Sequence, residues 1–192
     1  MKKVVLDIET KNTFADVGKR EPTALDISLL GIYSYDTDSY HSFTEKEFVD
    51  LWRILEQTEM IIGFNSNHFD IPLLNKYYPG DLTKIRSLDL LEEIEKMLGR
   101  RISLDAIAQA TLGINKSVHG LQAVEWWRNG EIEEVRKYCL DDVHITKEIY
   151  EFALKNQFIK YEFFGEIRQI PLDSHRWEEG GEGGQINYTL PI

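Results

Sequence analysis

Two carboxylates close a short apolar run near the start of the chain. Residues 4–6 are Val, Val and Leu, and Asp7, Ile8 and Glu9 follow them directly. Such aliphatic residues are typical of a buried β-strand, on which side chains alternate between faces, so Asp7 and Glu9 project to the same side. Two acids on one covered surface repel each other unless a cation lies between them. The spacing indicates a divalent-metal site, although Asp-x-Glu at a strand end is also common as a solvated edge.

Two further acids lie where a metal ligand would fit. Asp70 follows a predicted buried strand, residues 60–65, and precedes Pro72 in the first turn of a helix. An Asp at such a junction is most often an N-cap, but an N-cap side chain can also face a metal. Asp142 interrupts the apolar stripe of the longest predicted helix, residues 131–156. A carboxylate on that stripe is costly unless it is paired or bound to metal.

One phenol accompanies the last of these acids. Tyr138 precedes Asp142 by one helical turn, so the two side chains project together. A Tyr–Asp hydrogen bond inside the core is the alternative to a functional pair. Asp141 lies about 100° round the helix, on a more solvated face.

Length and composition bound the class of protein. The chain has 192 residues, 42% of them hydrophobic, which is enough for one well-buried domain and a small appendage. It has no apolar run of about 18 residues and no signal-type segment, so we expect a cytoplasmic protein that does not enter a membrane. Cys139 is the only cysteine and excludes an intrachain disulfide.

The net charge of −11 argues against strong non-specific binding to nucleic acid. Phosphate contacts from Lys and Arg supply most of that affinity, and the sequence shows no obvious basic patch. If the substrate is a polynucleotide, metal ions and a few scattered cations must neutralise it, and the candidates are Lys76, Lys84, Arg86, Arg100, Arg101 and Lys116.

The elements that must position these groups alternate between strands and helices. Residues 29–35 and 40–43 predict an antiparallel meander with the first strand, after a surface loop at 11–27. Helices follow at 45–55 and, after the strand at 60–65, from Asp70 onward. A short strand at 84–88 precedes helices that end at Gly99 and Gly113, a tryptophan-bearing helix, and the long helix 131–156.

Three segments together resemble the exonuclease motifs of the DEDD (DnaQ-like) superfamily. They are Asp7-Ile8-Glu9, the stretch from Asn65 to Asp70, and Tyr138 to Asp142, whose Tyr-x-x-x-Asp spacing marks the tyrosine branch. Proofreading domains of family B DNA polymerases carry similar motifs, and residues 103–142 look more like stand-alone YprB-like domains. The resemblance covers about residues 1–155.

The resemblance implies an α/β, RNase H-like fold: a mixed five-stranded sheet, three strands antiparallel and two added in parallel, flanked by helices. It also implies that four carboxylates hold two Mg²⁺ or Mn²⁺ ions and that Tyr138 positions the attacking water. The implied ligands are Asp7, Glu9, Asp70 and Asp142. Smaller substrate-binding roles fall on Thr10, Asn65 and Phe69, of which Phe69 is equally a core residue.

The implied activity is metal-dependent 3′-to-5′ hydrolysis at the 3′ end of single-stranded nucleic acid, DNA favoured, with release of nucleoside monophosphates. An exoribonuclease and a non-catalytic module that binds nucleic acid or a protein are the alternatives. The acidic composition motivates the non-catalytic module, but the presence of all four implied metal ligands together with Tyr138 argues against it. A role in DNA repair would need another chain.

Residues 160–192 depart from the family's common core. We expect a domain at 1–159 followed by an extension with a hairpin at 161–170, a Gly/Glu-rich linker and a short terminal segment. That extension is a candidate docking site for a protein partner.

Overall fold

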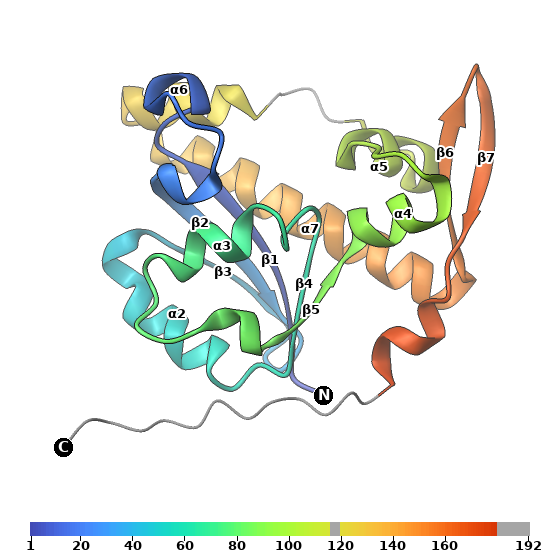
Figure 1. Cartoon of the computed structure of the whole chain (residues 1–192), viewed down its shortest axis with the longest axis horizontal. Helices are drawn as coiled ribbons and strands as arrows, with labels where there is room; N and C mark the ends of the chain where they lie inside the picture. Colours follow the sequence, from blue (N-terminus) through green and yellow to red (C-terminus); the bar gives the residue numbers. More distant parts are fainter. Residues whose placement is uncertain (116–119, 180–192) are drawn as a thin grey trace.

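Five strands form a mixed sheet in the order β3-β2-β1-β4-β5 in the computed structural model of the chain, which describes residues 1–115 and 120–179 (Figure 1). The first three strands pair antiparallel, and β4 and β5 are added in parallel beside β1. This confirms the predicted sheet. The strands are β1 (Lys3–Thr10), β2 (Ile27–Ser34), β3 (Ser39–Phe43), β4 (Met60–Gly63) and β5 (Arg86–Asp89).

Helices flank the sheet, and short 3-10 turns link several elements. The α-helices are α1 (Phe14–Val17), α2 (Phe48–Leu55), α3 (Asp70–Asn75), α4 (Leu90–Leu98), α5 (Leu104–Leu112), α6 (Leu121–Asn129) and α7 (Ile132–Asn156). The 3-10 turns are η1 (Pro22–Ala24), η2 (Glu45–Glu47), η3 (Leu82–Lys84) and η4 (Ser174–Glu178). Glycines in the left-handed conformation end α4 and α5 at Gly99 and Gly113, as the sequence predicts.

Three local predictions were wrong in detail. Residues 11–27 are not all loop, because Thr13 and Asp16 form a capping box that starts α1. The strand predicted at 84–88 begins only at Arg86, since η3 occupies the preceding residues. The strand predicted at 60–65 ends at Gly63, and Asn65 adopts a positive φ of 67°.

The alternation along β1 divides the interior into two clusters. Val4, Leu6 and Ile8 pack with α2 and α3 on one face of the sheet, whereas Val5 packs with residues of α7 on the other. Asp7 and Glu9 follow Val5 at intervals of two residues and therefore lie on the α7 side. The long helix α7 crosses β1 and β2 on this face (Figure 1).

After α7 the chain forms a hairpin, β6 (Phe158–Phe163) and β7 (Glu166–Pro171), and then η4. The hairpin spans the position predicted for it. Ile159, Ile170 and Trp177 join the cluster that includes α7 residues. Lys116 and the predicted short terminal segment lie outside the described residues, as does most of the predicted Gly/Glu-rich linker.

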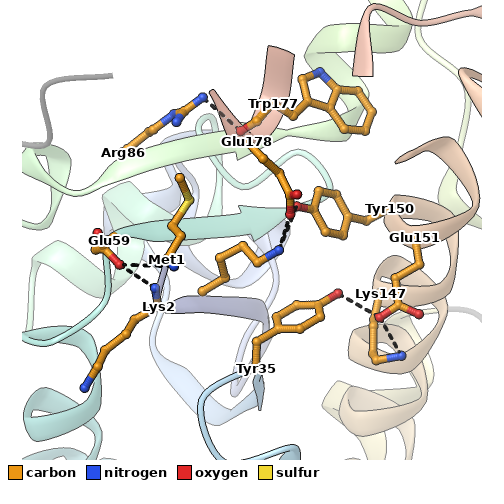
Figure 2. Close-up of polar contacts among 11 residues, drawn as sticks. Met1, Lys2, Tyr35, Glu59, Arg86, Lys147, Tyr150, Glu151, Trp177 and Glu178 are labelled. Atoms are coloured by element: carbon orange, nitrogen blue, oxygen red, sulfur yellow. Dashed lines mark hydrogen bonds and ion pairs between the residues drawn. The ribbon is translucent and has the colours of Figure 1, made fainter. Parts of the chain in front are cut away.

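Polar contacts fasten η4 to the start of β1 and to β5. Glu178 points to Tyr150, whose hydroxyl donates to it over 2.9 Å (Figure 2). Lys3 forms an ion pair with the same carboxylate. Arg86 donates to the carbonyls of Trp177 and Glu179, at 2.9 and 2.8 Å. The C-terminal part of the described chain is thus tied to the amino end of the central strand.

Candidate metal centre and pocket

Three carboxylates meet between β1 and α7. Each of Asp7, Glu9 and Asp142 offers a ligand oxygen, and these oxygens lie within 4.8 Å of one another. Glu9 and Asp142 are buried, at 9% and 7% exposure, and Asp7 is half-buried. Clustered carboxylate oxygens are the donors that hard divalent cations such as Mg²⁺ and Mn²⁺ prefer, so the residues present fit the expected metal.

The helical phase of α7 determines which of two adjacent acids, Asp141 or Asp142, faces the sheet. Asp142 is buried on the side of the helix that faces the sheet, whereas the adjacent Asp141 is exposed, as the apolar stripe predicts. Tyr138 is half-buried one turn before Asp142 and makes an edge contact with the Trp126 ring, centroid to centroid 6.2 Å.

Gly31 of β2, which is not among the residues predicted from the sequence, allows α7 to pack closely against the sheet. Gly31 lies opposite Asp7 on β2. A β-carbon at Gly31 would lie 2.9 Å from the Cys139 sulfur and 3.1 Å from a methyl of Val143, both on α7. An isolated glycine inside an apolar strand is the sequence signal for such a close backbone approach. Gly31 therefore brings Asp142 within reach of β1.

The pKa of the Cys139 thiol responds to the charge of the three carboxylates. Its thiol is buried and lies 3.5 Å from the carbonyl oxygen of Asp7. Burial raises the pKa of this thiol well above its usual value, and the negative charges of Asp7, Glu9 and Asp142 raise it further. The same negative charges that raise the pKa of the thiol favour a bound cation.

Asp70, the fourth predicted ligand, lies outside the three-carboxylate group found among residues 1–115 and 120–179. It is 5% exposed and is the first residue of α3, so Phe69 and not Asp70 is the N-cap. Burial raises the pKa of its carboxyl to about 7, and the charge of Asp89 adds to the rise, while hydrogen bonds from the amides of Asp70 and Ile8 lower it. The bond to Ile8 places Asp70 against the same strand as Asp7 and Glu9.

The loop between β4 and α3 is held by a buried acid of the next strand. Asp89, 3% exposed, accepts hydrogen bonds from the amides of Asn65 and Asn67 at 2.7 and 3.0 Å. It also caps α4 by accepting from the amides of Leu91 and Glu92. Asp89 thus links the loop before α3 to the first turn of α4, a contact that only the fold reveals.

A pocket of about 420 Å³ opens beside the carboxylates. Glu9, Thr10 and Phe69 line it together with apolar residues of β1, α1 and α6, and Phe14 meets Phe69 edge to face at 6.2 Å. A β-carbon at Gly120, another lining residue, would lie 3.7 Å from the Tyr138 hydroxyl. The pocket thus combines an apolar wall with one of the three carboxylates, Glu9, close to the Tyr138 hydroxyl, and its volume suits a small ligand.

A bulge in β2 lies opposite the end of β1, beside two residues that line the pocket, Glu9 and Thr10. Glu9 pairs with Leu29 but Thr10 pairs with Ile27, so β2 carries an extra residue, Ser28, at that point. A bulge bends and twists the strand that carries it, which re-aims the neighbouring side chains. Thr10 there donates to the carbonyl of Asn12 at 2.9 Å.

Asn65 does not line the pocket. Its side-chain oxygen accepts from Arg101, which also pairs with Glu95 at 3.3 Å. Two other candidate cations are also occupied elsewhere. Lys76 pairs with Asp26 at 2.9 Å, and Arg86 donates to the backbone carbonyls of Trp177 and Glu179. Among the described residues, these cations form no common patch next to the carboxylates. Within the same part of the chain, no helix is both long and apolar enough to cross a membrane.

Comparisons with known proteins agree on the fold. The model of the RNase H superfamily matches residues 4–154. A search of the curated proteins found no match. Among solved structures, the family B DNA polymerase of the hyperthermophilic archaeon Pyrobaculum calidifontis is similar over 80% of this chain, with a TM-score of 0.61 and 21% identity. A zinc-bound complex of E. coli ExoI with single-stranded DNA is similar over 81%, with a TM-score of 0.53 and 14% identity.

The chain spans only part of these two proteins, 24% of the polymerase and 41% of ExoI. At such low identity they establish the fold alone. The family model is a stronger finding, because it covers most of the chain, including β1, the loop before α3, and nearly all of α7. This chain belongs to the RNase H superfamily.

Proposed function

We propose that the chain is a metal-dependent 3′-to-5′ exonuclease of the DEDD tyrosine branch, acting on the 3′ end of single-stranded nucleic acid, with DNA favoured. The observation that carries the proposal is the group of three carboxylate oxygens within 4.8 Å beside a pocket lined by Glu9. The polymerase and the ExoI–single-stranded DNA complex of the same fold support nucleic acid as the substrate.

In this proposal Asp7, Glu9 and Asp142 hold the metal ions, with Asp70 as a further ligand from the start of α3. Two bound Mg²⁺ or Mn²⁺ ions would supply Lewis acidity, which lowers the pKa of the attacking water and stabilises the leaving oxygen of an in-line displacement. The carboxylates themselves repel a phosphodiester, so a strand end binds there only when their charge is neutralised.

The remaining residues place the substrate. The terminal nucleoside enters the pocket, where Phe69 contacts it on an apolar wall and Thr10 contacts it at the bulge. Asn65 lies outside the pocket lining and acts on the penultimate nucleotide from the loop before α3. Tyr138, whose hydroxyl lies near the pocket-lining Gly120, orients the water for attack on phosphorus.

The reaction is a hydrolysis that needs no other reactant. The water oxygen forms a bond to phosphorus, and the bond from phosphorus to the 3′ oxygen of the preceding nucleotide breaks. That oxygen takes a proton and becomes the new 3′ hydroxyl. A nucleoside 5′-monophosphate leaves, and the strand is one nucleotide shorter.

The direct test is incubation of the protein with matched DNA and RNA oligonucleotides labelled at the 5′ end, with Mg²⁺, with Mn²⁺ or with EDTA. We expect a ladder that shortens from the 3′ end of the DNA and depends on metal. Faster shortening of the RNA would make the enzyme an exoribonuclease. Intact strands under every metal condition would refute the enzyme and favour the non-catalytic binding module that the net charge of −11 motivates.

A further inference from the structure

The tip of the β6–β7 hairpin exposes an aromatic ring on an unfavourable backbone. Phe164 is 91% exposed and has a φ of 51°, and Gly165 follows it with a φ of 80°. Two-residue hairpin turns with two positive φ angles favour Asn-Gly or Asp-Gly, and a bulky residue at the first position is an outlier. Stability alone therefore disfavours Phe164, and an outlier of this kind points to a functional role.

Two guanidinium groups lie near the ring of Phe163, next to the tip. The central carbon of Arg168 lies 4.6 Å from the centroid of the Phe163 ring, and that of Arg100 lies 5.2 Å from it. Arg100 also lies 5.6 Å from the Tyr161 centroid. Arginine stacks on aromatic faces while it binds phosphate, and aromatic side chains stack on bases of any sequence. Arg168 also pairs with the exposed Glu166 over 2.8 Å, so a phosphate bound there exchanges one anionic partner for another. Rings and arginines together match the chemistry of a single strand.

Hydrogen bonds and buried apolar contacts anchor the hairpin to the rest of the molecule. The Thr111 hydroxyl of α5 donates to the carbonyl of Lys160 at 3.0 Å and accepts from its amide at 2.9 Å. Ile159 and Ile170 are buried in the cluster shared with α7. The position of the tip relative to the sheet is fixed by these contacts, so it can guide a strand without first becoming ordered.

A series of contacts connects the hairpin to the loop beside the carboxylates. Arg100 packs on the hairpin rings, and its neighbour Arg101 donates to the side chain of Asn65. Asn65 lies in the loop that leads to Asp70. In Figure 1 the tip of the hairpin lies at the upper right and the end of β1 lies toward the upper left, near α6. A strand whose 3′ end occupies the pocket must therefore run along the long axis of the molecule to reach the tip.

We propose that the hairpin tip binds single-stranded nucleic acid upstream of the 3′-terminal nucleotide, a proposal that rests on the proposed function. Phe164 stacks on a base, and Arg100 and Arg168 bind the flanking phosphates. These contacts of the hairpin tip compensate for the weak phosphate binding that is expected of an acidic chain near its metal centre. It acts only on strands long enough to reach the tip.

The first test is binding of 5′-fluorescein-labelled DNA in Mn²⁺, which neutralises the carboxylates, measured by fluorescence anisotropy on long and short nuclease-resistant phosphorothioate strands of about 20 and about 3 nucleotides. Phe164→Asn removes the ring and suits the left-handed turn, so the hairpin is kept. We expect it to weaken binding of the long strand about tenfold and to leave the short strand unchanged, as for the loss of one stacked base. Phe164→Trp should retain wild-type affinity.

The salt dependence of binding tests the arginines. Arg100→Gln and Arg168→Gln should each lower the slope of log K against log salt by about 0.7 on the long strand. Two exposed positions provide controls: Arg53→Gln on α2, where Arg53 pairs with Asp50, and Ile167→Ala on β7. Neither control should change the affinity or the slope.

Equal affinities of wild type and Phe164→Asn for the long strand would overturn the proposal. A concentration-dependent dimer that Phe164→Asn abolishes in sedimentation experiments would assign the ring to a second copy of the chain and would also overturn it. The proposed function fails by a different result: wild type binds the long strand through the hairpin, yet shortens no strand with any metal.

Discussion

At the residue scale, two adjacent acids with the same chemistry differ in their surroundings. Asp142 is buried among the carboxylates, and Asp141 is exposed. We predict that Asp142→Asn lowers the cleavage rate by orders of magnitude, because an amide binds metal poorly and misplaces the water. Asp141→Asn should change the rate only a few-fold, and Tyr138→Phe should fall between them. Single-turnover cleavage of a 5′-labelled oligonucleotide at saturating Mn²⁺ measures all three.

A dead Asp141→Asn enzyme with an active Asp142→Asn enzyme would contradict this assignment. Circular dichroism of each variant provides the control for folding. Asp141→Asn is itself the matched control, since it makes the same chemical change one residue away on the same helix.

Asp7 is predicted to couple metal binding to stability. Its carboxylate lies with Glu9 and Asp142 in one group, so Asp7→Ala relieves repulsion in the metal-free protein and removes a ligand. We expect a slightly higher melting temperature for Asp7→Ala in EDTA and a much smaller gain on adding Mn²⁺ than wild type shows, because a ligand that binds only the native state stabilises it. Thermal melts with and without Mn²⁺ measure both effects.

An equal Mn²⁺ gain in wild type and Asp7→Ala would show that Asp7 is not a ligand. Asp105→Ala, a change of an acid outside the carboxylate group, is the control and should keep the full gain.

At the element scale, the distance between α7 and the sheet decides whether the carboxylates meet. A methyl group at Gly31 would lie 2.9 Å from the Cys139 sulfur. We predict that Gly31→Ala destabilises the protein by about 1–3 kcal/mol through overpacking and reduces the Mn²⁺ gain in melting temperature, since α7 carries Asp142 away from β1. Urea unfolding and metal melts are the measurements.

The double variant Gly31→Ala/Cys139→Ala sharpens this prediction. Removal of the sulfur makes room for the new methyl group, so the double variant should recover part of the stability and of the metal gain, a coupling that a double-mutant cycle quantifies. Purely additive effects would mean that the close contact does not set the position of the helix.

At the scale of the whole molecule, Trp177 joins the C-terminal segment to the body of the fold. It is 5% exposed, stacks on Tyr150 at 5.9 Å and donates to Glu93 at 3.1 Å. We predict that Trp177→Ala costs about 3–5 kcal/mol of unfolding free energy, as expected for a buried aromatic. Urea denaturation measures the loss, and the neighbouring exposed Arg176→Ala should stay close to wild type. A change as small as that of the control would mean that the segment docks without contributing to stability.

The contacts of Glu178 in η4 are expected to make the stability of the fold depend on pH. The hydrogen bond from Lys3 lowers the pKa of Glu178 below 4.5, with a further contribution from Tyr150 (Figure 2). A lowered carboxyl pKa stabilises the fold above the unfolded pKa, and this stabilisation is lost as the pH falls through the folded pKa. Wild type should therefore melt above Glu178→Gln at neutral pH, and the difference should shrink below about pH 4.5.

Because the Glu178 side chain is 45% exposed, we expect the difference to be modest, below about 1 kcal/mol. Glu179→Gln, the adjacent exposed acid, is the control and should match wild type at every pH. A difference that stays constant from neutral to acid pH would contradict the ion pair with Lys3.

The sequence by itself determined the features that depend on local periodicity and on end signals. The alternation in β1 placed Asp7 and Glu9 on one face, the stripe on α7 placed Asp142 on the buried side, and glycines marked the ends of α4 and α5. These features are readable because the period of a strand or helix fixes the direction of each side chain before any element packs. The predicted sheet follows from the same patterns and the resemblance.

Tertiary structure decided everything that depends on how distant elements pack. The approach of α7 at Gly31, the position of Asp70 against Ile8 outside the three-carboxylate group, and the binding of Asn65 to Arg101 all join elements far apart in sequence. Local patterns give the direction of a side chain but not its distance from another element, because that distance follows from the volumes and polar partners that the whole interior must accommodate.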